Sequence, residues 1–278
     1  KMDKRTKVRN TLVITILTIA LIAFFNYAFE GDWVSIGIFT ACIVFPVLIL
    51  LDGSLTKIER SRIFVIYIVA FFVIFFWAAY EQAGASLTLF ASEQTNRDIF
   101  GWEMPASWFQ LFVVVLAYIM PGVWGFLNKR KMEPASPTKQ AIGLLLLSLG
   151  YLFICFGVKD AVPGVKVSMI WLTGLYFIHT MGEIALSPIG LSMVNKLSPL
   201  RFASLMMGIW YLSTATANKF AGMLSGLYPE AGKVKSIFGY QIATMYDFFM
   251  VFVVMSGVAS LILFLLSKKL QKMMHGVE

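Results

Sequence analysis

The chain has 278 residues, of which 59% are hydrophobic and only 14% are charged, and its mean hydropathy is +0.78. Soluble domains have about 45–50% apolar and about 25% charged residues, so this composition excludes an ordinary soluble domain. The formal net charge of +8 does not by itself indicate a nucleic-acid partner, because membrane topology can place basic residues unevenly. We therefore expect an all-α integral membrane protein.

Eight apolar stretches follow one another along the chain, and each is long enough to cross a bilayer. A spanning helix needs about 20 residues, within a range of about 17–25. Continuous runs of this length favour helices over the alternating strands of a membrane barrel. The longest of them must tilt, bend or protrude from the bilayer. The stretches are 11–29, 33–51, 63–91, 107–127, 140–158, 168–194, 202–228 and 243–267.

The first two stretches are joined by the tight turn Glu30-Gly31-Asp32 and contain no charged residue, which indicates a helix hairpin beside the main bundle. The chain begins at Lys1 without a small-residue cleavage site, so we expect no signal peptide. This start is compatible with a piece of a longer protein. We divide the sequence into residues 1–56, a cytoplasmic start with a two-helix hairpin, and residues 57–278, a six-helix bundle.

The third stretch contains a carboxyl group, Glu81, about two-thirds of the way along and towards the expected outer side. Gln82 and three small residues, 83–85, follow it. A carboxylate at membrane depth is costly and commonly marks an ion or substrate pathway, which favours a functional role. The alternative is a structural carboxylate that pairs with a basic residue or a hydroxyl group.

The sixth stretch holds the residues around which the chain is organised. Glu183 lies deep inside this apolar run. Pro188 lacks a backbone donor, so the helix should bend beside that carboxylate. His179, Glu183 and Ser187 follow at intervals of four residues and therefore share one helix face. This combination predicts a site at mid-membrane depth.

The role of His179 stays open between a hydrogen-bonded residue at a helix interface and a proton relay. A metal shared with Glu183 is rejected, because a catalytic metal site needs about three protein ligands and no third one is evident. Cys42 and Cys155 both lie inside apolar runs without metal-ligand spacing. We therefore expect no disulfide, no metal and no cofactor.

The seventh stretch carries a stripe of small residues, which usually allows two helices to approach closely. We interpret the stripe, and a GxxxG pattern beside it, in this way. The stripe consists of Ser213, Ala217, Ala221 and Ser225, and the GxxxG pattern of Gly222 and Gly226.

Three further side chains near these last stretches have open roles. Trp210 fits core packing and pocket lining equally well. Lys219 is expected to pair with a carboxylate or to reach towards the outer surface. Asp247, near the start of the eighth stretch, is expected to be a helix-end charge at the outer interface.

The basic residues are distributed unevenly over the connections. The set of connections that includes both termini holds 17 Lys and Arg residues, whereas the opposite set holds five. Cytoplasmic loops carry the excess of Lys and Arg, so both termini are expected in the cytoplasm. The high pI then reflects topology, and no nucleic-acid partner is expected. No nucleotide loop, nucleophile elbow or membrane-protease motif is present, so we expect no catalytic residues and no enzyme.

Three stretches give the sequence a resemblance to the proton-dependent oligopeptide transporter family of the major facilitator superfamily. They are FFWAAYEQAGASLTLFA at 75–91, GEIALSPIGLSMVNKLSP at 182–199 and MMGIWYLSTATANKFAGMLSG at 206–226. They match family helices seven, ten and eleven in order and spacing. The chain thus resembles the carboxy-terminal half of such a transporter, and residues 1–56 resemble the helix pair that bacterial members insert before that half.

The resemblance implies roles for four residues. Glu183 matches the helix-ten glutamate that is thought to receive the amino terminus of the peptide, and Ser187 and Trp210 lie in the same pocket. Glu81 matches the helix-seven glutamate that takes part in proton coupling. In one departure from the family, Ser107-Trp108-Phe109-Gln110 is not followed by the usual asparagine of helix eight.

The resemblance therefore implies half of a proton-coupled di/tripeptide symporter in a bacterial inner membrane. Its expected partners are di/tripeptides, protons, the lipid bilayer and an amino-terminal six-helix half. That half supplies positive charge for the peptide carboxylate, so this chain alone should not transport. The alternative is a non-transporting membrane scaffold or assembly subunit, in which a buried glutamate pairs with a partner helix.

Overall fold

The computed structural model describes residues 4–105, 111–161, 165–230 and 232–277 of the chain. Helices dominate this part of the protein, as predicted, and they fall on the eight apolar stretches. The third stretch is divided, because a short 3-10 turn separates two α-helices. The helices are α1 (Lys4–Ala28), α2 (Trp33–Leu50), α3 (Lys57–Tyr80), η1 (Glu81–Gly84), α4 (Ser86–Glu93), α5 (Phe112–Lys129), α6 (Ser136–Val158), α7 (Met169–Leu197), η3 (Leu200–Phe202), α8 (Ala203–Ser225) and α9 (Met245–Met273).

Within the described residues, seven helical segments are long and apolar enough to cross a membrane, with α3, η1 and α4 counted together as Lys57–Glu93. Eight spanning segments were expected; all eight stretches are helical, and seven of them are this apolar. The segment that falls short is α8, although its 23 residues exceed the length required. Serine, threonine, asparagine and lysine side chains lower its hydropathy. Its packing inside the bundle could not be inferred from apolarity alone.

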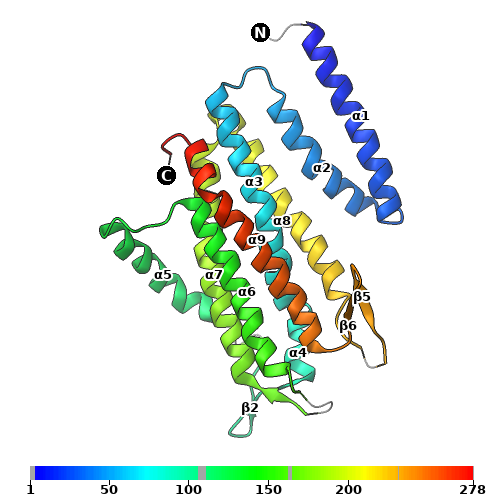
Figure 1. The fold of residues 1–278 in the computed structure, drawn as a ribbon, viewed down its shortest axis with the longest axis vertical. Coiled ribbons are helices and arrows are strands. Elements are labelled where there is room, and N and C mark those ends of the chain that lie inside the picture. Colours follow the sequence, from blue (N-terminus) through cyan, green and yellow to red (C-terminus); the bar gives the residue numbers. More distant parts are fainter. Residues whose placement is uncertain (1–3, 106–110, 162–164, 231, 278) are drawn as a thin grey trace.

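The strands are short and lie in the connections, at the end of the molecule opposite the two termini (Figure 1). Each pair contains only two or three residues a strand, far less than a barrel wall requires. One parallel pair joins β1 (Thr95–Asn96) to β4 (Val167–Ser168). The antiparallel pairs join β2 (Asp98–Ile99) to β3 (Trp102–Glu103) and β5 (Lys235–Ile237) to β6 (Tyr240–Ile242).

Polar side chains fix the starts of several helices. Thr56 and Thr244 form capping boxes with Glu59 and Asp247 at the first turns of α3 and α9. Such boxes satisfy two backbone donors that the helix itself leaves unpaired. Asp247 is thus a helix-end charge, as predicted.

The core of the bundle is built around α6, which packs against both α7 and α9 (Figure 1). Glycines allow α6 and α7 to approach closely. A Cβ atom added to Gly143 would lie 2.8 Å from the Leu186 Cβ and 2.9 Å from the Gly182 carbonyl oxygen. Glycine is therefore required at this crossing, which brings the helix that carries Glu183 against the centre of the bundle.

The predicted hairpin is present, with α1 packed on α2 and α2 packed on α8 and α3. Asp32, in the turn of the hairpin, caps α2 and forms an ion pair of 2.6 Å with the Lys219 ammonium of α8. The prediction that Lys219 pairs with a carboxylate is confirmed. The pair fixes the turn of the hairpin to the main bundle.

The small-residue stripe of α8 is used as predicted, whereas the GxxxG pattern is not. Ser213, Ala217 and Ala221 are buried, and α8 packs extensively on α3. A Cβ atom added to Gly222 would have no neighbour within 4 Å. In the described chain, therefore, no helix approaches α8 at this glycine, and that part of the prediction was wrong.

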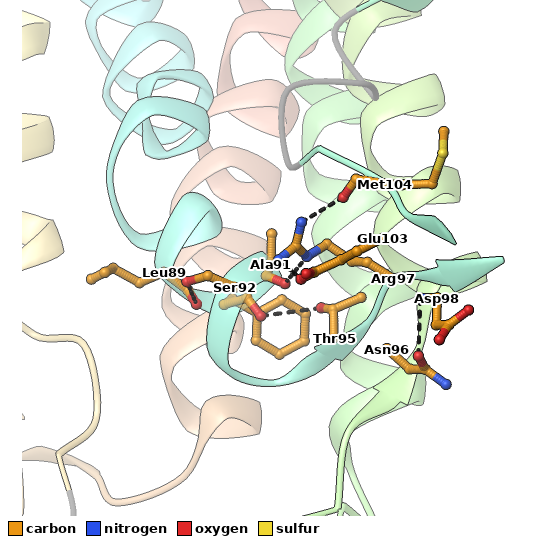
Figure 2. Close-up of polar contacts among 10 residues, drawn as sticks. Leu89, Ala91, Ser92, Thr95, Asn96, Arg97, Asp98, Glu103 and Met104 are labelled. Atoms are coloured by element: carbon orange, nitrogen blue, oxygen red, sulfur yellow. Dashed lines mark hydrogen bonds and ion pairs between the residues drawn. The ribbon is translucent and has the colours of Figure 1, made fainter. Parts of the chain in front are cut away.

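Arg97 closes the loop that follows α4 (Figure 2). Its guanidinium donates to the carbonyl oxygens of Ala91, at 2.9 Å, and Met104, at 2.5 Å, and pairs with the Glu103 carboxylate. The Val167 amide donates to the Gln94 carbonyl oxygen at 2.8 Å beside the parallel strand pair. The loop after α4 is thereby fixed to the start of α7.

Candidate functional site

The α3 helix ends at the position where the sequence places its first deep carboxylate. Tyr80 is the last residue of α3, and Glu81 opens the 3-10 turn η1 before the chain becomes helical again in α4. Such a break leaves backbone groups unpaired, which is tolerated at membrane depth only where other groups satisfy them.

Two side chains, those of Gln82 and Tyr151, hydrogen-bond backbone carbonyl oxygens at this break. The Gln82 amide donates to the carbonyl oxygens of Ala78, at 3.1 Å, and of Ala221 in α8, at 3.0 Å. The Tyr151 hydroxyl of α6 donates to the Ala79 carbonyl oxygen at 2.7 Å. Hydrogen bonds to α6 and α8 therefore stabilise the break.

Glu183 faces α3 across this break. The hydroxyl group of Tyr80 donates to Glu183 Oε2 at 2.5 Å, and both residues are half-buried. Among the described residues, Glu183 Oε1 has no hydrogen-bond donor. The carboxylate thus lies between α7 and α3, with one oxygen engaged and the other open.

Ser187 of α7 and Trp210 of α8 lie further along the α7 face that carries Glu183. Ser187 is half-buried one turn beyond Glu183, and Gly190 follows at the next turn. A Cβ atom added to Gly190 would lie 2.4 Å from the Trp210 ring, so the indole packs directly on this glycine. Seven residues of helix rise about 10 Å. Trp210 therefore lies about two turns from Glu183, with Ser187 between them.

The two carboxylates Glu81 and Glu183 are near enough for their charges to interact. In the described chain the Glu81 carboxylate makes no hydrogen bond and no ion pair, although the residue is half-buried. A structural partner for Glu81, the alternative weighed from the sequence, is therefore not found among the described residues.

His179 lies in the helix interface. It is 2% exposed, and its ring nitrogen Nε2 bonds the Leu147 carbonyl oxygen of α6 at 3.1 Å. Its ring packs on Gly150, where an added Cβ would lie 2.4 Å from the imidazole. This geometry favours the interface role over the proton relay. His179 lies about one turn before Glu183 on α7, but its side chain bonds α6 whereas that of Glu183 bonds α3.

Neither Glu183 nor Glu81 borders the hollow that lies further along α7. That hollow, of about 650 Å³, includes Pro188 and Ser192 on one side and Lys139 on the other. Lys139, in the first turn of α6, is paired with Glu133 of the preceding connection. Glu183 and Glu81 are only half-buried, so the candidate site lies on a partly open face of the described bundle.

Sequence reasoning did not identify Tyr80, Gln82 or Tyr151 as parts of the site. Tyr80 and Gln82 flank Glu81 in the sequence, so their position beside a deep carboxylate was an available signal. Tyr151 lies on α6, far away in the sequence, and nothing in its local pattern points to Ala79. The helix-eight stretch Ser107 to Gln110 lies outside the described residues. Cys42 and Cys155 are both free cysteines in the described chain.

The described helices form a bundle whose segments are long and apolar enough to cross a membrane. The profile of the POT family matches residues 6–246. The chain therefore belongs to the POT family, and the resemblance inferred from its three stretches is confirmed. The relatives in this family are peptide transporters rather than enzymes, in agreement with the prediction.

The relatives share moderate identity with parts of the chain. The peptide transporter YePEPT of Yersinia enterocolitica is 34% identical over 180 residues, which cover 63% of this chain and 35% of that protein. The uncharacterized transporter YclF of Bacillus subtilis is 32% identical over 253 residues, which cover 88% of this chain and 48% of that protein. The chain thus spans at most about half the length of these relatives.

Solved structures share the fold. A crystal structure of a mutant peptide transporter POT in complex with alafosfalin aligns over 99% of this chain and 55% of that one, with a TM-score of 0.74 and 27% identity. A POT family transporter in complex with 5-aminolevulinic acid aligns over 97% of this chain and 56% of that one, with a TM-score of 0.73. At 24% identity, the second likeness is one of fold alone. The bundle is multi-pass and membrane-embedded.

Proposed function

We propose that this chain is the carboxy-terminal half of a proton-coupled di/tripeptide symporter. In this proposal residues 57–278 form the transporter bundle and residues 1–56 form its accessory hairpin. An amino-terminal six-helix half covers the open face and completes the peptide site. The observation that carries the proposal is Glu183, a carboxylate inside an apolar helix with one oxygen held by Tyr80 and the other open.

The site residues divide between two tasks. Glu183 receives the amino terminus of a peptide, while Ser187 and Trp210 line the next turns of the same pocket. Glu81, at the break after α3, binds and releases the coupled proton. A carboxylate that pairs with a cation in one conformation and with a proton in another can couple proton entry to alternating access.

The protein is proposed to lie in a bacterial inner membrane with both ends of this chain in the cytoplasm. The bias of 17 basic residues against five supports this orientation. The two described ends of the chain lie at the same end of the bundle (Figure 1), which agrees with eight crossings when α8 is counted with the seven more apolar segments.

The proposal is tested with Glu183→Gln in the complete reading frame that contains this chain. The amide has nearly the same shape as the carboxylate but cannot pair with an ammonium group as an ion, so peptide uptake should fall about tenfold or more, as expected for a lost charge-assisted hydrogen bond. Uptake of a radiolabelled dipeptide into proteoliposomes gives the measurement. Ser225→Ala, on the partly exposed end of α8, is a control that should transport normally.

A scaffold or assembly subunit predicts a different result. In that case the complete reading frame would lack peptide uptake, or Glu183→Gln would leave uptake unchanged. Either result would remove the transport assignment of Glu183. A reading frame that continues upstream into six further membrane spans would support the symporter.

A further inference from the structure

The hydrogen bond between Tyr80 and Glu183 leaves the carboxylate half occupied. At 2.5 Å the contact has the length of a charge-assisted O–H to O⁻ bond. An ionised carboxylate offers about four lone-pair positions on its two oxygens. Tyr80 uses Oε2, so Oε1 remains available for a cation that arrives from outside the described chain.

Tyr80 is held by packing that does not depend on Glu183. Its ring stacks on Phe76, with centroids 5.5 Å apart and planes 16° apart. It meets Trp77 edge to face at 5.5 Å and 83°. Phe76 is fully buried. The phenol is therefore oriented by the α3 core, and the hydroxyl position is set before it meets the carboxylate.

The break in α3 fixes Tyr80 in depth as well as in direction. Gln82 and Tyr151 hold the carbonyl oxygens of Ala78 and Ala79, the two residues just before Tyr80. The end of α3 consequently cannot slide along α6 or α8 without losing the bond from Tyr151 or the bond from Gln82 to the Ala221 carbonyl oxygen. The Glu183 carboxylate, at the end of a flexible side chain, gains a fixed orientation from such a donor, which reduces the entropy that is lost when a ligand binds.

On the basis of the proposed function, we propose that Tyr80 is a positioning residue for peptide recognition. Its hydroxyl group holds the Glu183 carboxylate so that the open oxygen meets the free amino terminus of the peptide. Tyr80 itself does not contact the peptide amino group. It acts through Glu183, and its effect should therefore disappear when Glu183 is no longer a carboxylate.

The first test is Tyr80→Phe in the full-length transporter. It removes the hydroxyl and keeps the ring stacked on Phe76, so KM for a dipeptide should rise about three- to tenfold, the effect of ordering one side chain on binding. The maximal rate should stay near that of the wild type. Tyr67→Phe is the matched control, because the Tyr67 hydroxyl on the same helix donates to the Met206 sulfur and not to Glu183 in the described chain, so KM should stay unchanged.

A double-mutant cycle with Glu183→Gln separates positioning from a general structural effect. Tyr80→Phe should raise KM in the wild type and add nothing in the Glu183→Gln background, because contacting residues show non-additive effects. An equal rise of KM in both backgrounds would overturn the proposal. Should Tyr80→Phe fail to reach the membrane, Tyr80→Met also lacks the hydroxyl and should give the same pattern.

The outcomes also separate this inference from the proposed function. If Glu183→Gln weakens uptake but Tyr80→Phe leaves KM unchanged, Tyr80 has no positioning role and the transport assignment stands. If Glu183→Gln has no effect on uptake, the proposed function fails and the role of Tyr80 fails with it. A dipeptide with an acetylated amino group should show no change of KM with Tyr80→Phe, and a change would count against the proposal.

Discussion

The two deep carboxylates differ in their immediate surroundings, although both are half-buried and lie near the same break in α3. Glu183 accepts a hydrogen bond from Tyr80, whereas Glu81 has no partner in the described chain. An engaged carboxylate is suited to hold a cationic ligand in one geometry. An unpartnered one can exchange a proton or a basic partner without first breaking an internal bond.

This contrast leads to a prediction for Glu81→Gln in the full-length transporter. The amide keeps the size of the side chain but cannot bind and release a proton, so accumulation driven by an imposed pH gradient should be lost. Exchange of peptide across the membrane without a gradient should persist. Uptake and counterflow in the same proteoliposomes measure the two activities.

The control for Glu81 is Glu30→Gln, which neutralises an exposed carboxylate in the hairpin turn. It should accumulate peptide as the wild type does. If Glu81→Gln concentrates peptide equally well, Glu81 is a structural residue and another group carries the proton.

At the scale of elements, glycines set how closely the helix that carries Glu183 approaches α6. Gly143 of α6 and Gly182 of α7 lie against one another's backbone. Small residues at helix interfaces let backbones approach closely in membranes. Gly182 directly precedes Glu183, so the depth and rotation of the candidate site follow from this crossing.

Gly143→Ala should therefore destabilise the bundle. The added methyl group would lie 2.8 Å from the Leu186 Cβ and 2.9 Å from a backbone oxygen, so α6 and α7 must move apart. Overpacking of this kind costs about 1–3 kcal/mol. Thermal unfolding of the purified transporter in detergent should show a lower midpoint for Gly143→Ala.

Gly208→Ala is the control for this substitution. Its added Cβ has no neighbour within 4 Å, and the residue lies within α8. Alanine favours the helix over glycine by about 0.8–1.0 kcal/mol, so the midpoint should stay the same or rise. An equal fall in both variants would show that the α6–α7 crossing is not the cause.

At the scale of the whole molecule, the hairpin is joined to the bundle by an ion pair between Asp32 and Lys219 and by the packing of α2 on α8. The hydrogen bond from Lys219, together with that from Ser35, lowers the pKa of Asp32 from 3.8 to about 2. Because the folded-state pKa is depressed, the pair stabilises docking fully above pH 3.8 and loses its effect as the pH falls towards about 2.

Asp32→Asn should consequently loosen the hairpin at neutral pH. Cys42 of α2 lies against Thr216 of α8, so Thr216→Cys in a Cys155→Ser background creates a crosslinking pair across this contact. Asp32→Asn should slow oxidative crosslinking of this pair, and the charge exchange Asp32→Lys with Lys219→Asp should restore the crosslinking rate.

The crosslink is detected with a protease site inserted in the 128–139 connection, which lies between positions 42 and 216. After cleavage, the two fragments stay joined without reductant only when the crosslink has formed.

Two results would argue against this role of the ion pair. One is an unchanged crosslinking rate in Asp32→Asn. The other concerns the unfolding midpoints of the wild type and Asp32→Asn. Well above pH 3.8 Asp32 is already fully ionised, so a difference between the two midpoints that still changes with pH there would contradict this role.

The sequence by itself determined the class of the protein, its helices and the identity of the candidate residues. Long apolar runs admit few folds other than membrane helices, because backbone groups in lipid must pair within their own segment. Glu81 and Glu183 stand out because charge is rare in such runs. The family resemblance added roles for these two glutamates, which remain proposals.

Only the tertiary structure decided which polar groups meet. The break of α3 depends on Gln82 reaching α8 and on Tyr151 reaching from α6, and neither contact is encoded in local periodicity. The stripe and the GxxxG pattern of α8 look alike in sequence, yet only the stripe is packed. Helix periodicity fixes which residues share a face, whereas the neighbour that covers each face follows from how the whole bundle packs.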